Sequence, residues 1–82
     1  MQINLKLIGR YKEITGKQEI TLQSTHGDTI WHVVDEFIKK YPTIEKDKKF
    51  IMVSKNNIYT TIDAKITDGD EITLSPPVVS GG

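Results

Sequence analysis

Residues 28–42 read DTIWHVVDEFIKKYP, and this stretch decides the fold. Its apolar side chains recur at intervals of three and four residues, the spacing of one helix face: Ile30, Val33, Val34, Phe37, Ile38 and Tyr41. We expect Asp28 to cap the amino end, because its side-chain oxygen can accept hydrogen bonds from the free amides of the first turn. Lys39 and Lys40 suit the carboxyl end of the helix dipole, and Pro42 ends the helix. The chain therefore contains one long amphipathic helix that needs an apolar surface to pack against.

Alternating apolar and polar residues predict strands on both sides of this helix. Two precede it, at residues 2–7 and 19–23, and we expect them to pair antiparallel. Three follow it, and their predicted ranges are 50–54, 58–62 and 71–74. An Asp68-Gly69-Asp70 turn leads into the last strand. We interpret residues 43–49 as a charged, solvated loop.

This order of elements predicts an α+β fold, with a mixed sheet of four to five strands and the one main helix packed on one face. The first and last strands then pair in parallel at the centre, which is the β-grasp, or ubiquitin-like, arrangement. We expect residues 1–75 to form this domain and to leave the second face of the sheet open for a partner. By alternation, the side chains of Ile8, Thr73 and Ser75 point away from the helix, so we expect partner docking there.

Residues 75–82 read SPPVVSGG, and they continue neither a helix nor a strand. The prolines fix φ and remove backbone donors, so we expect residues 76–82 to leave the domain as a flexible tail with a stiff, extended start. Gly81 and Gly82 carry no side chain, so the terminal carboxylate can pass where any other residue would collide with an enclosing wall. The tail alone fits two interpretations: delivery of a carboxylate into another protein's active site, or a frayed end.

Composition narrows the function classes. The 82 residues suffice for one domain, and the 11 basic and 11 acidic residues cancel, which gives no electrostatic case for nucleic acid or an anionic membrane. No stretch reads as a membrane span or a signal peptide, so we expect a cytoplasmic protein. Cysteine is absent, and His26 and His32 lack clustered ligands, so we expect no metal site. Without a phosphate-binding loop or a nucleophile elbow, the domain is not expected to be catalytic alone.

Three segments resemble a known family. YKEITGK at residues 11–17 resembles the R-E-L-T-G-K segment of the MoaD-like small subunit of molybdopterin synthase, a sulfur carrier of the ubiquitin-like β-grasp family. DGDEI at 68–72 and PPVVSGG at 76–82 resemble the family's D-G-D-E-V…P-P-V-S-G-G ending. Two features depart from the family. Ser75 stands where a bulky apolar residue is common, and the tail has one extra residue in Val78-Val79-Ser80.

The resemblance implies a sulfur carrier that works through partners. In this family a MoeB-like enzyme, related to ubiquitin-activating enzymes, uses ATP to adenylate the terminal carboxylate, and a sulfur donor system converts it to a thiocarboxylate. On this chain that group would form on Gly82, and the chain itself would bind no cofactor. The MoaE-like large subunit would then take in the tail and use the sulfur for the dithiolene of molybdopterin. The tail residues that would enter it are Pro76, Pro77, Val78, Val79, Ser80 and Gly81.

Other functions share the same terminus, and the sequence leaves them open. A related carrier would serve another pathway, such as thiazole formation or tRNA thiolation, although thiazole carriers are usually shorter and lack the PPV ending. A ubiquitin-like modifier would be joined through Gly82 to lysines of other proteins by the same activation chemistry. The remaining hypothesis is a β-grasp interaction module whose terminal glycines are incidental.

Overall fold

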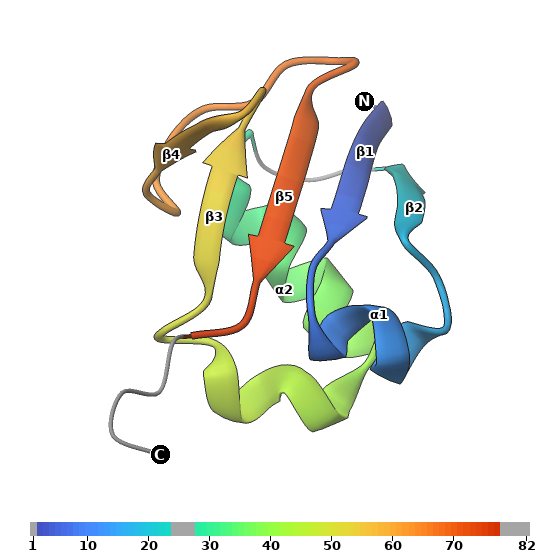
Figure 1. Cartoon of the computed structure of the whole chain (residues 1–82). Coiled ribbons are helices and arrows are strands. Elements are labelled where there is room, and N and C mark those ends of the chain that lie inside the picture. Colours follow the sequence, from blue (N-terminus) through green and yellow to red (C-terminus); the bar gives the residue numbers. More distant parts are fainter. Residues whose placement is uncertain (1, 24–27, 78–82) are drawn as a thin grey trace.

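One mixed sheet of five strands, in the order β2-β1-β5-β3-β4, forms the front layer of the molecule in Figure 1. The computed structural model describes residues 2–23 and 28–77. β1 (Gln2–Leu7) pairs antiparallel with β2 (Glu19–Gln23) and parallel with β5 (Glu71–Ser75). The predicted β-grasp sheet, with the first and last strands parallel at its centre, is confirmed.

β3 (Met52–Lys55) and β4 (Ile58–Thr60) form a hairpin on the far side of β5. The turn between them consists of Asn56 and Asn57, whose φ angles are 50° and 70°. Asparagine tolerates this left-handed region better than most residues with a side chain, because its short amide can bond locally. The two asparagines therefore suit the tight turn that joins β3 to β4.

The outer ends of this hairpin are shorter than predicted. The predicted ranges, 50–54 and 58–62, are wrong where the backbone finds other partners. The amide of Phe50 donates to the carbonyl of Asp47 at 2.8 Å, which keeps residue 50 in a turn before β3. The carbonyl of Ile62 accepts from the amide of Trp31 in the first turn of the main helix at 2.7 Å, so residue 62 does not pair with β3. Pairing of the two strands therefore stops early.

Helix α2 (Ile30–Lys40) crosses the back of the sheet, as predicted (Figure 1). Its predicted apolar stripe supplies five buried side chains: Ile30, Val33, Val34, Phe37 and Ile38. These side chains meet the inward residues of β1 and β5, and together they form the core. Apolar residues recur along one side of α2 and along one side of β1 and β5. Because these two apolar surfaces pack against each other, one helix is enough to cover the sheet.

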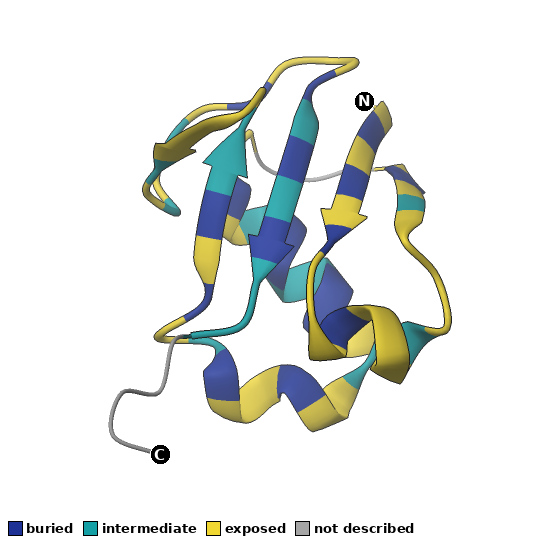
Figure 2. Ribbon diagram, in the orientation of Figure 1, coloured by how far each residue is buried: buried dark blue, intermediate teal, exposed yellow. Residues whose placement is uncertain are grey.

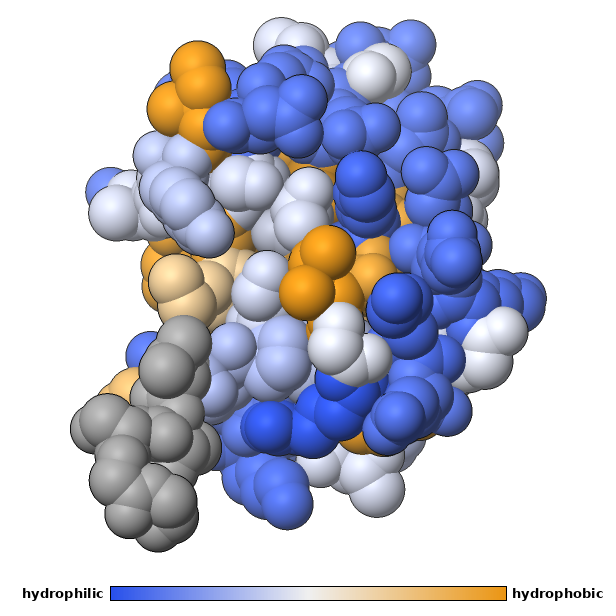
Figure 3. Space-filling model, viewed as in Figure 1, coloured by the Kyte–Doolittle hydropathy of each residue, from blue (hydrophilic) through white to orange (hydrophobic). Residues whose placement is uncertain are grey.

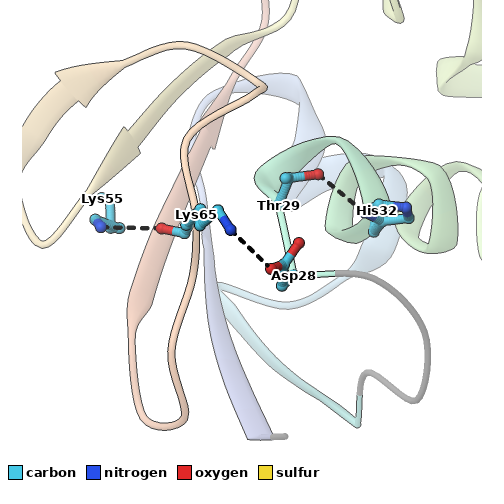
Figure 4. A network of polar contacts seen from close by, with 5 residues as sticks. All are labelled: Asp28, Thr29, His32, Lys55 and Lys65. Atoms are coloured by element: carbon cyan, nitrogen blue, oxygen red, sulfur yellow. Dashed lines mark hydrogen bonds and ion pairs between the residues drawn. The ribbon is translucent and has the colours of Figure 1, made fainter.

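The predicted cap of α2 is wrong, because the helix begins one residue later than Asp28 would require. Thr29 is the N-cap, in an extended conformation, and makes no side-chain hydrogen bond to the helix amides. The carbonyl of Asp28 accepts from the amide of Ile66 at 2.8 Å, so the chain is still extended at this point. Figure 4 shows the Asp28 carboxylate facing Lys65 and the Thr29 hydroxyl facing His32, at 3.4 Å and 2.9 Å.

Two short helices lie at the carboxyl ends of β1 and β5 (Figure 1). They are α1 (Arg10–Thr15) and the 3-10 helix η1 (Pro42–Asp47). The interpretation of residues 43–49 as a solvated loop is wrong, since Ile44 is 1% exposed and Asp47 only 6%. A single buried isoleucine among lysines and acids has no periodicity to reveal it, so the sequence pattern favoured a surface loop.

The face of the sheet opposite α2 is uncovered, as predicted. In Figure 2 the central strands alternate between buried and more accessible residues, and no helix lies in front of them. β5 shows the rule: Ile72 and Leu74 are fully buried toward α2, whereas Glu71, Thr73 and Ser75 are half-buried. Figure 3 shows that this face is mainly hydrophilic, with isolated hydrophobic residues. We call it the open face.

The predicted Asp68-Gly69-Asp70 turn is confirmed, and it fastens the start of β5. Gly69 has a φ of 87°, which a residue with a side chain rarely adopts. The Asp70 carboxylate, in a residue only 9% exposed, accepts from the amide of Thr67 at 2.8 Å and from the side chain of Asn56 at 3.1 Å. Burial acts to raise the pKa of Asp70, but these hydrogen bonds outweigh it and hold the pKa below its usual value.

Acid should therefore weaken the domain through Asp70. The ionised carboxylate stabilises the fold above its unfolded-state pKa of about 3.9, and this stabilisation is lost as the pH falls through the lower folded-state pKa. Asp70→Asn should lower the free energy of unfolding by about 1–2 kcal/mol at neutral pH. The difference from wild type should shrink below about pH 4. Urea unfolding at neutral and acidic pH tests this, and a difference independent of pH would contradict it.

Candidate functional site

The candidate site is the tail, whose described part begins where β5 ends. β5 finishes at Ser75, which pairs with Met52 of β3. Pro76 and Pro77 follow, and both are half-buried against the domain. We call residues 75–77 the tail root. The remaining predicted tail residues lie outside the described part of the chain: Val78, Val79, Ser80, Gly81 and Gly82.

Gly9 forms one wall of the tail root. It lies between β1 and α1 with a φ of 61° and a ψ of −134°. A Cβ atom at this position would lie 3.4 Å from Cγ of Pro76 and 3.7 Å from Cδ, which is ordinary van der Waals contact. The positive φ, rather than lack of space, is therefore what calls for glycine here. Gly9 could not be predicted as a site residue, because its only signal in the sequence is a glycine between a strand pattern and a helical turn.

Replacing Gly9 should be costly because of its backbone angles. Gly9→Asn should lower the free energy of unfolding by about 1–3 kcal/mol, since a φ of 61° with a ψ of −134° lies outside the left-handed helical region that asparagine tolerates. Gly16→Asn is the matched control, because Gly16 has left-handed helical angles and no atom within 4 Å of its would-be Cβ. Equal melting temperatures for the two variants would contradict this account.

A buried polar network lies beside Gly9. The Oδ2 atom of Asp47 accepts hydrogen bonds from the hydroxyl of Tyr11 at 2.9 Å and from Nη2 of Arg10 at 2.5 Å. Tyr11 has no exposed surface. Burial, and then the hydrogen bond to the carboxylate, raise the pKa of Tyr11 far above its usual value. Tyr11 therefore keeps its proton, and it acts as a permanent donor to Asp47 rather than as an acid or a base.

The three residues predicted to dock a partner lie on β5 and directly after the neighbouring strand β1. Thr73 and Ser75 are on the open face of β5, because Ile72 and Leu74 occupy the buried positions between and beside them. Ile8 follows β1 and is 40% exposed, and its amide donates to the carbonyl of Leu74 at 3.1 Å. The structure thus places all three near the root of the tail. Their role in docking stays a prediction.

Exposed apolar side chains near the tail root were not singled out from the sequence. Met52, the strand partner of Ser75, is 36% exposed, and Phe50, just before β3, is 67% exposed. Tyr59 of β4 is 75% exposed and pairs with Ser54. The alternation pattern predicts which face a strand residue takes, but it does not say that residue 50 leaves the strand. These exposed side chains lie at separate points between the segment beside the tail root and the edge strand β4.

An open depression of about 460 Å³ lies where β3 and β4 separate. Its lining combines aliphatic residues with lysines and hydroxyl groups, including Lys48, Ile51, Met52, Tyr59 and Ile62. No carboxylate, histidine or cysteine lines it. Among the described residues, no group of three potential metal ligands forms, and none of the helices is long and apolar enough to cross a membrane.

Comparison with known proteins gives consistent results. The model of the ThiS family matches residues 5–82. The molybdopterin synthase sulfur carrier subunit of Arabidopsis thaliana is 33% identical over 82 residues, which cover 100% of this chain and 84% of that protein.

Solved structures show the same fold. The small archaeal modifier protein 1 of Methanosarcina acetivorans is 25% identical, with a TM-score of 0.80 over 99% of this chain and 96% of that one. A chain in the complex of subunits 1 and 2 of the molybdopterin-converting factor from Helicobacter pylori is 16% identical, with a TM-score of 0.66 over 99% of this chain and 100% of that one. The sequence match spans nearly the whole chain and the fold agrees with it, so this protein belongs to the ThiS family of β-grasp sulfur carriers.

Proposed function

We propose that this protein is the sulfur-carrier subunit of a molybdopterin synthase and that Gly82 carries the sulfur. The observation that carries the proposal is the 33% identity to the Arabidopsis thaliana subunit over the full 82 residues of this chain. The described structure is compatible with it, because β5 leads directly into the tail root. The described residues hold no cluster of three potential metal ligands, which fits a protein whose reactive group is made and used by partners.

The chemistry assigns the reactive step to the terminus. A terminal carboxylate is ionised at neutral pH and is a poor acyl donor. Its oxygen would attack the α-phosphate of ATP in the activating enzyme, which forms a mixed anhydride with AMP and releases pyrophosphate. Sulfide from the donor system would then attack the carbonyl carbon, with AMP as the leaving group, and leave a thiocarboxylate on Gly82. If a donor persulfide attacks instead, a thiol must cleave the resulting acyl disulfide, which releases the thiocarboxylate and leaves a disulfide on the donor. This chain would contribute a docking surface, a tail that reaches the partner's active site, and a terminus without side chains.

The proposed partner in sulfur delivery is the large subunit of the synthase. The Helicobacter pylori structure is a complex of the two subunits of a molybdopterin-converting factor, which supports a two-subunit assembly for this chain as well. We propose that the large subunit covers the open face around Thr73 and Ser75 and takes in the tail. Ser75 offers a small hydroxyl there, so the opposing surface must fill the space that a bulkier side chain would occupy.

Intact-mass measurement tests the proposal. The chain is produced with and without its cognate activating enzyme, ATP and a sulfur donor. We expect the loaded chain to gain the mass that replaces one oxygen by sulfur, and we expect the large subunit to co-purify with it. If the terminus stays a carboxylate beside an active activating enzyme, the sulfur-carrier proposal fails.

A second candidate is a protein modifier, which the likeness to the Methanosarcina acetivorans small archaeal modifier protein 1 favours. In that case Gly82 would form an isopeptide bond to lysines of other proteins after the same adenylation. Peptide mapping of proteins from the producing cells distinguishes the two functions, since conjugation leaves the carboxyl-terminal peptide of this chain on the modified lysine. Trypsin cleaves after Lys65 and at no later position, so the expected remnant is residues 66–82. A carrier for another thiolation pathway would load sulfur but would not restore molybdopterin to a reconstituted synthase.

A further inference from the structure

We infer that Asp47 is a positioning residue, which fixes the direction in which the tail leaves the domain. The purpose of this role, delivery of Gly82 to a partner's active site, rests on the proposed function. Its geometry rests on the contacts of residues 75–77. Asp47 lies at the end of η1, and its hydrogen bonds go to Arg10, Tyr11 and Phe50, not to the tail root or the strands of the open face. It acts through the two segments between which the tail root lies.

The tail root has a wall on each side. The first is the junction of β1 and α1, where a Cβ atom at Gly9 would lie 3.4 Å from Cγ of Pro76. At the same junction the amide of Ile8 donates to the carbonyl of Leu74 in β5 at 3.1 Å. The second is the segment that leads into β3. Met52 pairs with Ser75, and the strands are antiparallel, so the chain just before Met52 runs beside the chain just after Ser75. The direction of the tail therefore depends on how these two walls are held relative to each other.

Asp47 joins the two walls. Its carboxylate accepts from Arg10 and Tyr11, the first two residues of α1 and the next in the chain after Gly9. Its backbone carbonyl accepts from the amide of Phe50 at 2.8 Å, which sets the turn that starts the second wall. One residue thus bonds to the first wall through its side chain and to the second through its backbone.

The link is strong because it is buried. Asp47 is 6% exposed and Tyr11 is 0% exposed, so loss of the carboxylate leaves the tyrosine hydroxyl without its partner in the interior. The backbones of α1 and η1 approach each other at few points, so the side chain of Asp47 is the main polar connection between these helices. A chain with the same core but without this link should hold the tail root less firmly.

Spin labels provide a test that does not depend on sulfur transfer. The chain has no cysteine, so Val78→Cys and Lys40→Cys give two unique labelling sites, one just beyond the tail root and one at the exposed end of α2. Dipolar spectroscopy then measures the distribution of distances between the labels. We expect Asp47→Ala to broaden this distribution or shift its mean, relative to a chain labelled at the same sites without that change.

Asp70→Asn is the matched control for that experiment. Asp70 is nearly as buried as Asp47 and also accepts two hydrogen bonds, but it lies at the opposite end of β5 from the tail root. We expect the control to leave the distance distribution unchanged although it lowers stability. Equal distributions for the unsubstituted chain and Asp47→Ala overturn the inference, and so does an equal change in both variants.

Adenylation kinetics test whether Asp47 affects recognition of the tail by the activating enzyme. At a temperature at which all variants are folded, Asp47→Ala should raise the KM of the activating enzyme for this chain by roughly fivefold, because an unaligned tail must be ordered on binding, while kcat stays the same. Asp70→Asn should change neither. An unchanged KM for Asp47→Ala counts against the inference even if sulfur loading proceeds. If the unsubstituted chain is not adenylated at all, the proposed function fails, and the spin-label result still decides the role of Asp47.

A milder variant covers the case in which Asp47→Ala does not fold. Arg10→Gln removes the ion pair and leaves the bond between Tyr11 and Asp47, and the Arg10 side chain is already 41% exposed. We expect a smaller change of the distance distribution in the same direction as for Asp47→Ala. A folded Arg10→Gln chain with the distribution and KM of the unsubstituted chain would overturn the inference.

Discussion

Deletion of Gly82 should abolish sulfur loading of this protein without changing the stability of its domain. The truncated chain ends at Gly81. Its carboxylate therefore lies one residue, about 3.3 Å, short of the place where the carboxylate of Gly82 would react in the activating enzyme. A shift of this size is large compared with the precision that a reacting carboxylate and an ATP phosphate need. The core residues all lie before the tail, so the free energy of unfolding should stay the same.

Ser80→Ala is the matched control for that deletion, because it changes a tail side chain and keeps the length. We expect this variant to be loaded with sulfur at nearly the rate of the unsubstituted chain. Intact mass after incubation with the activating enzyme reports loading, and urea unfolding reports stability. Normal loading of the truncated chain would remove Gly82 from its proposed role, whereas unfolding of that chain would show that the tail supports the domain.

Phe37→Ala should have the largest effect on stability. Phe37 is 0% exposed, and its ring lies 6.1 Å from that of Tyr11 in an edge-on arrangement and 5.3 Å from that of Tyr41. Loss of a buried phenylalanine costs about 3–5 kcal/mol, from the lost transfer of the ring out of water and from the cavity that remains. A domain of this size has a total stability of only about 5–10 kcal/mol, so the variant should be close to its unfolding threshold.

Phe50→Ala is the same substitution at a residue that is 67% exposed. It should change the free energy of unfolding by no more than about 0.5 kcal/mol. Urea unfolding of the two variants in parallel gives the comparison. A loss at Phe37 as small as the loss at Phe50 would mean that the core collapses around the missing ring or that the aromatic contacts contribute little.

Regular features of the fold could be predicted from the sequence because they repeat. The helical stripe around Phe37 repeats every three to four residues over the whole of α2, and β1 alternates without a break. Each repeat fixes which side faces the core, and the core then fixes the two layers. The parallel pair of β1 and β5 follows from the order of elements once one helix has to cover the whole sheet.

Single contacts between distant segments could not be predicted in this way. Asp47 is buried only because Tyr11 and Arg10 reach it from the other end of the chain, and a lone aspartate among lysines carries no sign of that. Asp28 has the chemistry of a cap but is held extended by a backbone bond to Ile66. Both differences come from tertiary contacts that outweigh a local preference.

The same distinction between regular patterns and single distant contacts applies to the candidate site. The reactive terminus was predicted from its composition and from the family ending, and that prediction concerns residues beyond the described part of the chain. The walls of the tail root were not predicted, since they depend on the backbone angles of Gly9 and on the buried bonds of Asp47. The sequence thus indicates the chemistry of the carboxyl terminus, and the structure adds which residues hold the tail root.

The central pairing of β1 with β5 also bears on how the protein is made. Residue 4 pairs with residue 71, so β1 has no neighbour on one side until β5 has been translated. Contacts between such distant parts of a chain form slowly. Until β5 arrives, β1 keeps an unpaired edge at the place that becomes the centre of the sheet. The strand that completes the sheet is also the strand that leads into the tail, so the base of the tail is positioned only when the central pairing has formed.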